Sequence, residues 1–367
     1  MNSKILIIYD YFYPAYKAGG ITQSLYNLFS ALQNKYSINV ICSNSDLNNE
    51  ALISDNKLDN TLYISKFTIL KYLIQLDKIS ISFIYLNGIF SLFFFVVPLV
   101  YFKIFYPKIK IIVAPRGMMQ AGALEIRSTK KNIYIKLLKI LGFFNNNIWH
   151  ATDEQELIDI KKTIGENSNI IIAKNIPKTP NTEIIKINKK NNSLKLVFMS
   201  LITEKKNLHL ILESIKLIKF NLFFDIYGPI KDASYWELCK TIIINLPANI
   251  QVNYKESIEP IFVQDTLQKY HALILPSKGE NFGHAIYEAL SVGRPIIISN
   301  FTPWNELNER KIGWNVETEE MMILNAINEL NLLTEIEYEL YCQNSLLCAK
   351  EYYKKSIDLD SYYSLFK

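Results

Sequence analysis

The sequence predicts an α/β protein that contains two parallel β-sheets, each covered by helices on both faces. Three observations lead to this prediction. The chain has 367 residues, which exceeds the usual size of one doubly wound sheet. Strand-like and helix-like segments alternate along both halves of the chain. A polar stretch near the middle separates these halves, and the alternation starts again after it.

The first half opens with the β-branched segment 5–9, which predicts a buried strand. A loop that contains Gly19 and Gly20 follows, and residues 22–32 then show apolar side chains at helical spacing. Further strands are predicted at 38–42, 82–86 and 109–114. Strands that are joined through helices in this way form a parallel sheet.

The second half begins after a segment rich in Pro, Thr, Asn and Lys, which we interpret as a linker. Its predicted strands lie at 194–199, 223–227, 250–254, 272–276 and 295–299. Its predicted helices lie at 208–218 and 282–292, with further helix within 335–366. We therefore expect a Rossmann-like domain at 1–177, a linker at 178–192, a second Rossmann-like domain at 193–350, and a C-terminal helix at 351–367 that packs towards the first domain. Two such domains place their ligand crevices at the carboxyl ends of the strands, facing one another across a cleft.

The composition fits a packed cytoplasmic protein. Hydrophobic residues make up 49% of the chain, charged residues make up 20%, and the net charge is +5. No dense block of Lys and Arg indicates a nucleic-acid partner. The four cysteines lack the spacing of a metal site, and the first residues lead directly into a strand. We therefore expect reduced thiols, no bound metal, no cofactor and no secretory signal.

The apolar stretch 89–102 allows two interpretations. It is shorter than the ~20 apolar residues of a membrane span, and Pro98 interrupts it. We interpret it as a buried helix of an α/β layer. The alternative is a peripheral contact with the cytoplasmic face of the inner membrane, since aromatic residues and nearby lysines also suit a membrane interface.

Residues 275–295 carry the motif with the most chemical content. They predict a strand, a loop with Gly279 and Gly283, and a helix whose free N–H groups suit a diphosphate. Glu280 precedes the helix and Glu288 lies two turns into it. Without further context, Glu280 could instead complement the helix dipole. Glu288 could lie on a solvated face of the helix. The apolar neighbours of Glu288 favour a carboxylate that needs a partner.

Glu280 and Glu288, with seven residues between them, resemble the E-x7-E signature of family 4 retaining glycosyltransferases, which have the GT-B fold. The flanking "LPS" and "GRPIIIS" are similar to the same family. The resemblance extends along the chain to the segments "YPAYKAGGITQSLYNLFSAL", "APRGMMQAGALEIRSTKKN", "WHATDEQEL", "KKNLHLILESI" and "TPWNEL". The subgroup that it resembles builds bacterial surface polysaccharides.

The resemblance implies a role for each matching residue. Glu288 would hold the ribose hydroxyls of the donor, and Glu280 would contact the donor sugar. Lys206 would stabilise charge on the leaving diphosphate, although a surface charge is the alternative interpretation of this lysine. The remaining donor-binding residues implied are Asn281, Phe282, Gly283, His284, Gly19, Gly20 and Gly228.

Two departures from the family pattern involve cationic residues. Leu201 stands where many members carry an arginine, so the second diphosphate cation is missing there. Arg116 follows Pro115 where members often have a histidine, and we include it among the catalytic residues. The alternative is a loop arginine paired with a nearby carboxylate. We expect His150 to be structural.

The implied reaction is transfer of a sugar, with retention, from a nucleoside-diphosphate sugar to a hydroxyl of a glycan or a polyprenyl-linked glycan. Lys206 and helix N–H groups would meet the leaving-group charge without a metal. Two alternatives remain open from the sequence. One is a noncatalytic subunit that binds nucleotide or glycan with the same fold, and the other is a nucleotide-sugar epimerase.

Overall fold

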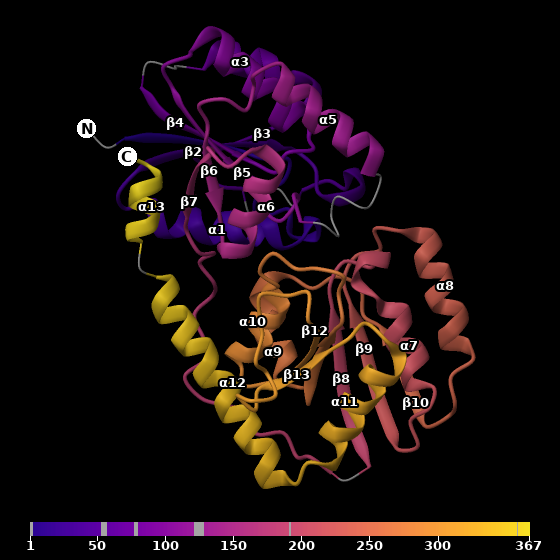
Figure 1. Cartoon of the computed structure of the whole chain (residues 1–367). Coiled ribbons are helices and arrows are strands. Elements are labelled where there is room, and N and C mark those ends of the chain that lie inside the picture. The colour runs from indigo at the N-terminus through magenta and orange to yellow at the C-terminus, as the bar shows by residue number, and fades with distance from the viewer. Residues whose placement is uncertain (1–2, 53–56, 77–79, 121–127, 191, 358) are drawn as a thin grey trace. The chain divides into compact units, whose positions relative to one another are not determined.

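The computed structural model describes residues 3–52, 57–76, 80–120, 128–190, 192–357 and 359–367. The chain divides into two compact units (Figure 1). The first unit comprises Met1–Ile176 and Ser356–Lys367, and the second comprises Pro177–Lys355. Within the described ranges, every helix is too short or too polar to cross a membrane.

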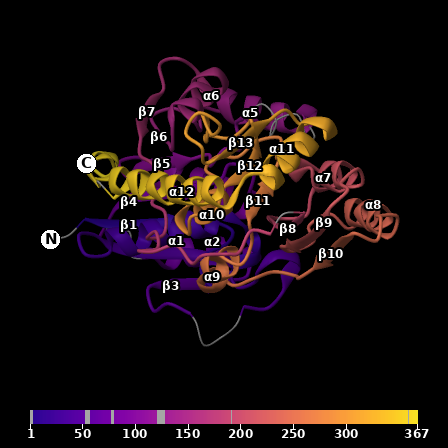
Figure 2. The same ribbon diagram turned by 90° about the horizontal axis from the view of Figure 1, so that it is seen from below.

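The first unit contains a seven-stranded parallel sheet in the order β3-β2-β1-β4-β5-β6-β7, and its strands other than β2 are labelled in Figure 2. The central strands are buried on both faces, as expected for a sheet covered by helices. The strands are β1 (Lys4–Ile8), β2 (Ser37–Ser43), β3 (Thr61–Ile64), β4 (Ile81–Asn87), β5 (Lys110–Ala114), β6 (Ile148–Ala151) and β7 (Asn169–Ile172).

Two helical layers cover the first sheet. One contains α2 (Ile69–Gln75), α3 (Val97–Phe105), α5 (Ser128–Ile140) and α6 (Glu154–Ile164), whose buried side chains share one core cluster. The other contains α1 (Gly20–Leu32) and α13 (Asp360–Leu365), which pack into a second cluster. Figure 1 shows α3 and α5 on the opposite side of the sheet from α1 and α13.

The second unit contains a six-stranded parallel sheet in the order β10-β9-β8-β11-β12-β13. Its strands are β8 (Ser193–Met199), β9 (Asn221–Tyr227), β10 (Ile250–Tyr254), β11 (Ala272–Leu275), β12 (Ile296–Ser299) and β13 (Gly313–Val316). Its helices are α7 (Leu208–Ile215), α8 (Ala233–Ile244), α9 (Val263–Leu267), α10 (His284–Ser291), α11 (Glu320–Leu332) and α12 (Glu335–Ser356).

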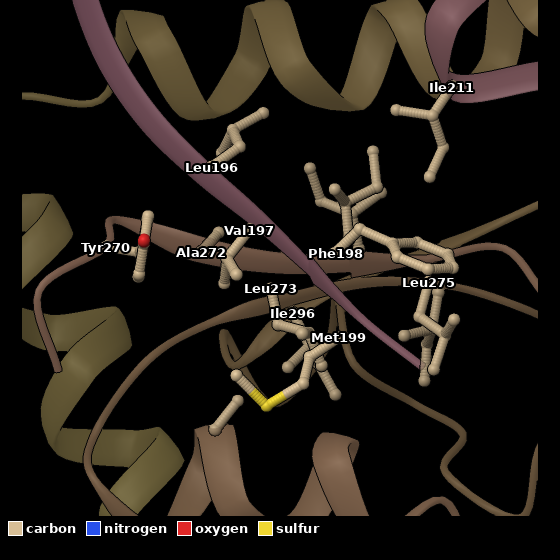
Figure 3. Close-up of a cluster of buried hydrophobic side chains, with 14 of the residues drawn as sticks. Leu196, Val197, Phe198, Met199, Ile211, Tyr270, Ala272, Leu273, Leu275 and Ile296 are labelled. Carbon is tan, nitrogen blue, oxygen red and sulfur yellow. The ribbon is translucent and has the colours of Figure 1, made fainter. Parts of the chain in front are cut away.

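The core of the second unit forms around β8 and β11. In Figure 3, the side chains of Leu196 and Met199 extend to opposite sides of the β8 ribbon. Residues from β11 and β12 fill the adjacent space, and Leu273 and Ile296 are fully buried. This burial on both faces explains why β11 and β12 are composed almost entirely of apolar residues.

The predicted fold class is confirmed, because both units have a parallel, Rossmann-like sheet covered by helices. The interpretation of 89–102 as largely buried helix is also confirmed. A π-helical turn (Leu92–Val96) leads into α3, and Phe95, Leu99 and Phe102 are fully buried.

The segment predicted as a linker, 178–192, contains no helix or strand in its described part and packs on the second unit. The buried Lys189 donates hydrogen bonds to the carbonyls of Asn331 and Leu333, at 2.8 and 2.6 Å. At the other end of the chain, α13 contacts β7 of the first unit. The Tyr362 hydroxyl donates to the Lys174 carbonyl at 2.8 Å.

Candidate functional site

The loop between β11 and α10 holds the residues of the predicted donor site. Asn281 and His284 are half-buried, and Phe282 is 5% exposed. Gly283 immediately precedes α10 with a φ of 77°. A side chain is strained in this left-handed conformation, and a Cβ there would lie 2.7 Å from Cδ1 of Ile286. The glycine therefore allows the chain to turn into the helix and leaves the first N–H groups of α10 at the loop.

Lys206 and Glu280 form an ion pair beside this helix end. Their Nζ and Oε1 atoms are 2.5 Å apart, and the side chains are 14% and 12% exposed. Lys206 ends a short 3-10 helix, Glu204–Lys206. The structure thus brings together two of the three predicted catalytic residues, although 74 positions separate them.

Hydrogen bonds fix the turn that carries Lys206 against the loop that carries Glu280. Asn207 adopts the left-handed conformation and its side chain donates to the Pro276 carbonyl at 2.8 Å. The Lys278 amide donates to the Lys205 carbonyl at 2.8 Å. Because these contacts involve the backbone of both segments, they hold the ion pair in place independently of its own attraction.

Glu288 is a buried carboxylate, so the interpretation of its position as a solvated helix face is wrong. It is 6% exposed, and the Lys178 ammonium lies 3.7 Å from Oε1. Lys178 also donates to the Pro260 carbonyl, and its own carbonyl accepts from the Tyr287 hydroxyl at 2.8 Å. Burial raises the pKa of Glu288 to about 7, although the Lys178 charge acts in the opposite direction.

An aromatic cluster supports the start of α10. The Trp304 indole donates to the Phe282 carbonyl at 2.6 Å. The Phe282 ring lies 5.7 Å from Trp304 and 5.5 Å from Tyr352 between centroids. Sequence reasoning assigned no role to Trp304 or Tyr352. Trp304 could have been found from its place in the segment "TPWNEL". A buried indole N–H needs a hydrogen-bond acceptor, so a tryptophan there indicates a contact with a neighbouring carbonyl.

Gly228, after β9, has a packing reason to be glycine. Its φ is 137°, and a Cβ there would lie 1.9 Å from the Ser200 carbonyl oxygen. Its amide donates to the Glu256 carbonyl at 2.7 Å. The segment that follows β9 therefore packs closely against the segment that follows β8 only because residue 228 is glycine. Leu201, which follows Ser200, is half-buried.

In the first unit, the Gly19-Gly20 loop leads into α1. Gly19 precedes the helix with a φ of 102°, and Gly20 is its first, exposed residue. The Lys17 amide donates to Asp46 at 3.1 Å, and its ammonium pairs with Glu50. These contacts attach the loop to the 46–50 segment of the same unit.

Arg116 lies directly after β5 and is 5% exposed. Its guanidinium donates to Oδ1 of Asn87 at 3.0 Å, to Oδ1 of Asn175 at 2.9 Å and to the Tyr85 hydroxyl at 2.8 Å. These partners are neutral, so the interpretation of Arg116 as a loop arginine paired with a carboxylate does not fit these hydrogen bonds. Arg116 instead joins the ends of three segments of the first unit.

The predicted structural role of His150 is confirmed. The ring is fully buried, with Nδ1 2.5 Å from the Tyr85 hydroxyl and Nε2 2.8 Å from the Ala173 carbonyl. Burial, followed by the nearby Arg116 charge, lowers the pKa of His150 to about 3. The neutral ring therefore donates through Nε2 to Ala173 and accepts the Tyr85 proton at Nδ1.

The four cysteines are free and buried. Over the described part of the chain, no three His, Cys, Asp or Glu side chains are grouped as metal ligands would be.

Comparison with known proteins finds a family similarity within the second unit. Residues 180–339 match the family described as "Glycosyl transferases group 1". No curated protein sequence matches the chain.

Several solved structures share the fold of nearly the whole chain. Sucrose-phosphate synthase from Thermosynechococcus elongatus has a TM-score of 0.78 at 14% identity, over 99% of both chains. HepE from Anabaena, solved in complex with UDP and glucose, has a TM-score of 0.75 at 13% identity, over 99% of both chains. WaaG, a glycosyltransferase involved in lipopolysaccharide biosynthesis, has a TM-score of 0.67 at 10% identity, over 97% of this chain and 99% of WaaG. Residues 180–339 are therefore similar to the glycosyl transferases group 1 family, and both units share the Rossmann-like fold of these solved glycosyltransferase structures.

Proposed function

We propose that the chain is a retaining glycosyltransferase that moves a sugar from a nucleoside-diphosphate sugar to a hydroxyl of a glycan or lipid-linked glycan. We further propose that it acts in the assembly of a bacterial surface polysaccharide and needs no metal. The observation that carries this proposal is the Lys206–Glu280 ion pair at the N-terminal end of α10.

This arrangement suits a departing diphosphate. When the bond between the anomeric carbon and the diphosphate oxygen breaks, its electrons remain on the diphosphate. The Lys206 ammonium and the N–H groups at the start of α10 are donors that can meet this charge. Glu280 holds Lys206 in position before the donor binds. The acceptor hydroxyl passes its proton to the departing diphosphate oxygen as its own oxygen forms the new bond to the anomeric carbon.

Glu288 supports the same proposal from within α10. A buried carboxylate with a raised pKa favours a ligand that donates hydrogen bonds to it. The hydroxyls of a donor ribose would supply such bonds. HepE has been solved in complex with UDP-glucose, which makes a UDP-sugar the first donor to test for this chain.

A donor screen tests the proposal directly. The purified chain is heated with UDP, GDP, ADP, TDP or their sugars, and a ligand at 100 times its dissociation constant should stabilise the fold by about 2.7 kcal/mol. Transfer or slow hydrolysis of the stabilising donor supports a transferase. An altered sugar that remains attached to its nucleotide would identify an epimerase, and binding without turnover would identify a noncatalytic subunit.

Metal dependence is tested with the same assay. Turnover should continue in EDTA, because Lys206 and the α10 N–H groups supply the positive charge. Loss of turnover with EDTA, followed by recovery with Mn²⁺ or Mg²⁺, would contradict the metal-independent chemistry.

A further inference from the structure

The second unit begins with a segment that packs along α10. We call residues 178–181 of this segment the entry segment. The Asn181 amide donates to the Ser291 carbonyl at 2.9 Å. The Gln264 side chain joins the entry segment to the helix, because its Nε2 donates to the Thr179 carbonyl at 3.0 Å and to Oγ of Ser291 at 2.9 Å. The entry segment is therefore fixed against α10.

Lys178, the first residue of the entry segment, is held through its backbone and its side chain. Its carbonyl accepts from the Tyr287 hydroxyl at 2.8 Å. Its ammonium donates to the Pro260 carbonyl and lies 3.7 Å from Oε1 of Glu288. The two paired side chains are 21% and 8% exposed. Because Lys178 is anchored at both ends, its ammonium stays beside the buried carboxylate.

The charge on Glu288 depends on two opposing effects. Burial disfavours the carboxylate and the Lys178 ammonium favours it, which leaves the pKa of Glu288 at about 7. The Tyr287 hydroxyl also lies near Glu288, and burial raises the pKa of this hydroxyl, so it remains neutral. The neighbouring helices bring the amide of Gln264 and the hydroxyl of Tyr353 to the entry segment. Without the ammonium of Lys178, burial would keep Glu288 protonated at neutral pH.

We propose that Lys178 is a positioning residue of the donor site, which keeps Glu288 in the form that accepts hydrogen bonds from the donor ribose. An ionised carboxylate only accepts hydrogen bonds, whereas the protonated group is also a donor. Lys178 acts on the donor through Glu288. This inference rests on the proposed function, in which Glu288 contacts the ribose. The segment that the sequence predicts to be a linker thereby takes part in donor recognition.

Carbon-13 NMR of the full chain, labelled at the glutamate carboxyl groups, measures the protonation of Glu288 without a ligand. The Glu288 signal is assigned by its loss in Glu288→Gln. In Lys178→Met, the titration midpoint of this signal should rise by about one to three pH units, because the ammonium 3.7 Å away is removed. Lys178→Arg keeps the positive charge, so its midpoint should stay near that of the original chain.

Calorimetry with UDP, or with another nucleotide that stabilises the chain in the donor screen, measures the effect on binding. At pH 8, a rise of one to two pH units in the Glu288 midpoint should weaken binding by about two- to tenfold in Lys178→Met. The loss should become smaller as the pH rises further. In a Glu288→Gln background, Lys178→Met should leave nucleotide affinity nearly unchanged, since the group on which Lys178 acts has been replaced.

Lys186→Met is the matched control. Lys186 belongs to the same predicted linker and pairs with Glu339 at 2.7 Å, but its side chain is 81% exposed. Its removal should change neither the Glu288 midpoint nor nucleotide affinity. Circular dichroism and the thermal midpoint check that each variant is folded. If Lys178→Met unfolds, Lys178→Gln replaces it, because glutamine lacks the charge but can still donate to the Pro260 carbonyl.

Two results would overturn the proposal. One is an unchanged Glu288 midpoint in the folded, uncharged Lys178 variant. The other is an equal loss of nucleotide affinity with and without Glu288, which would indicate a purely structural role for Lys178. Normal nucleotide binding combined with either result contradicts the role of Lys178 alone. Absence of nucleotide binding in the original chain contradicts the proposed function, and the role of Lys178 in the donor site with it.

Discussion

The two cationic residues that the sequence placed in the catalytic set, Arg116 and Lys206, have opposite surroundings. Arg116 is 5% exposed and donates to three neutral oxygens. Lys206 is half-buried and donates to one carboxylate, that of Glu280. Each lies after a strand of a parallel sheet, where ligands of such folds bind.

These surroundings indicate that Arg116 stabilises the fold, whereas Lys206 is placed where it can contact a ligand. Breaking the contacts of Arg116 would leave several buried polar groups without their donor. Lys206 has a partner on a loop at the start of α10, and a diphosphate there can share or replace that partner. We therefore expect substitutions of Arg116 to act mainly on stability and substitutions of Lys206 to act mainly on rate.

Lys206→Ala should have the largest effect on activity. Removing a donor aimed at charge that develops in the transition state lowers kcat by about 10²–10³. The thermal midpoint should change little, because the ion pair lies outside the hydrophobic core clusters. Single-turnover kinetics with the donor identified in the screen measures the effect.

Lys278→Ala is the control for this variant. Lys278 pairs with Glu204 at 2.8 Å on the same turn and loop, but both side chains are largely exposed. Its removal should leave kcat near that of the original chain. If Lys206→Ala turns over at the original rate, Lys206 is a surface charge and the proposed leaving-group chemistry is wrong.

Arg116→Met should have the largest effect on stability. The substitution removes the donor to Asn87, Asn175 and Tyr85, and the two asparagines are 0% and 2% exposed. We expect the free energy of unfolding to fall by about 3 kcal/mol, because buried acceptors are left unpaired. Urea denaturation measures this change.

The control is Arg310→Met, which removes an exposed ion pair with Glu351. Such surface pairs contribute about 0–1 kcal/mol, so the control should be nearly as stable as the original chain. An Arg116→Met variant with unchanged stability and lost activity would place Arg116 in the catalytic machinery and remove the contrast with Lys206.

Much of the fold was predictable because the central strands are buried on both faces. The residues of β11, and those of β1 after Lys4, are uninterrupted apolar runs for this reason. The strands that the sequence did not reveal are short, and three of them lie at sheet edges, where polar residues are tolerated. These three are β3, β7 and β13, and the fourth, β6, contains His150.

The partners within the candidate site could not be predicted in the same way. Sequence spacing places Glu280 and Glu288 on one loop and helix, but it does not show which cation faces each one. Lys178, the partner of Glu288, lies at the start of the segment interpreted as a linker. Arg116 finds its acceptors 29, 31 and 59 residues away, two of them on β4 and one after β7. Such pairings depend on the three-dimensional path of the chain.

Glu288 extends the comparison of Arg116 and Lys206 to an acidic residue. Its contribution to stability depends on pH. Its pKa is raised from 4.5 to about 7 in the folded chain, so the folded state binds more protons than the unfolded state between these values. Its contribution to stability is therefore present below pH 4.5 and is lost as pH rises through 7. Glu288→Gln removes this dependence, so the variant should gain stability relative to the original chain between pH 5 and pH 8.

The same variant should bind the donor nucleotide several-fold more weakly at pH 8, since a charge-assisted hydrogen bond contributes about 1.5–3 kcal/mol. Calorimetry in two buffers also detects the proton that the original chain should release when ribose hydroxyls stabilise the carboxylate. Unchanged nucleotide affinity in Glu288→Gln would reject Glu288 as the ribose contact.

Leu201→Arg should have the smallest effect, and it asks whether Lys206 lacks a second cation. Leu201 is half-buried after Ser200, three residues before the turn that ends at Lys206. A partly exposed arginine there adds a charge near the diphosphate and contributes about 0.2–1 kcal/mol, so donor affinity should rise by no more than about fivefold. Arg116 should not make this addition redundant, because three neutral acceptors in the first unit already hold its guanidinium.

Leu201→Gln, which supplies a polar side chain without charge, should leave affinity unchanged. Equal affinities for the Arg and Gln variants would show that the diphosphate charge is already balanced, and Arg116 would then be the first residue to re-examine.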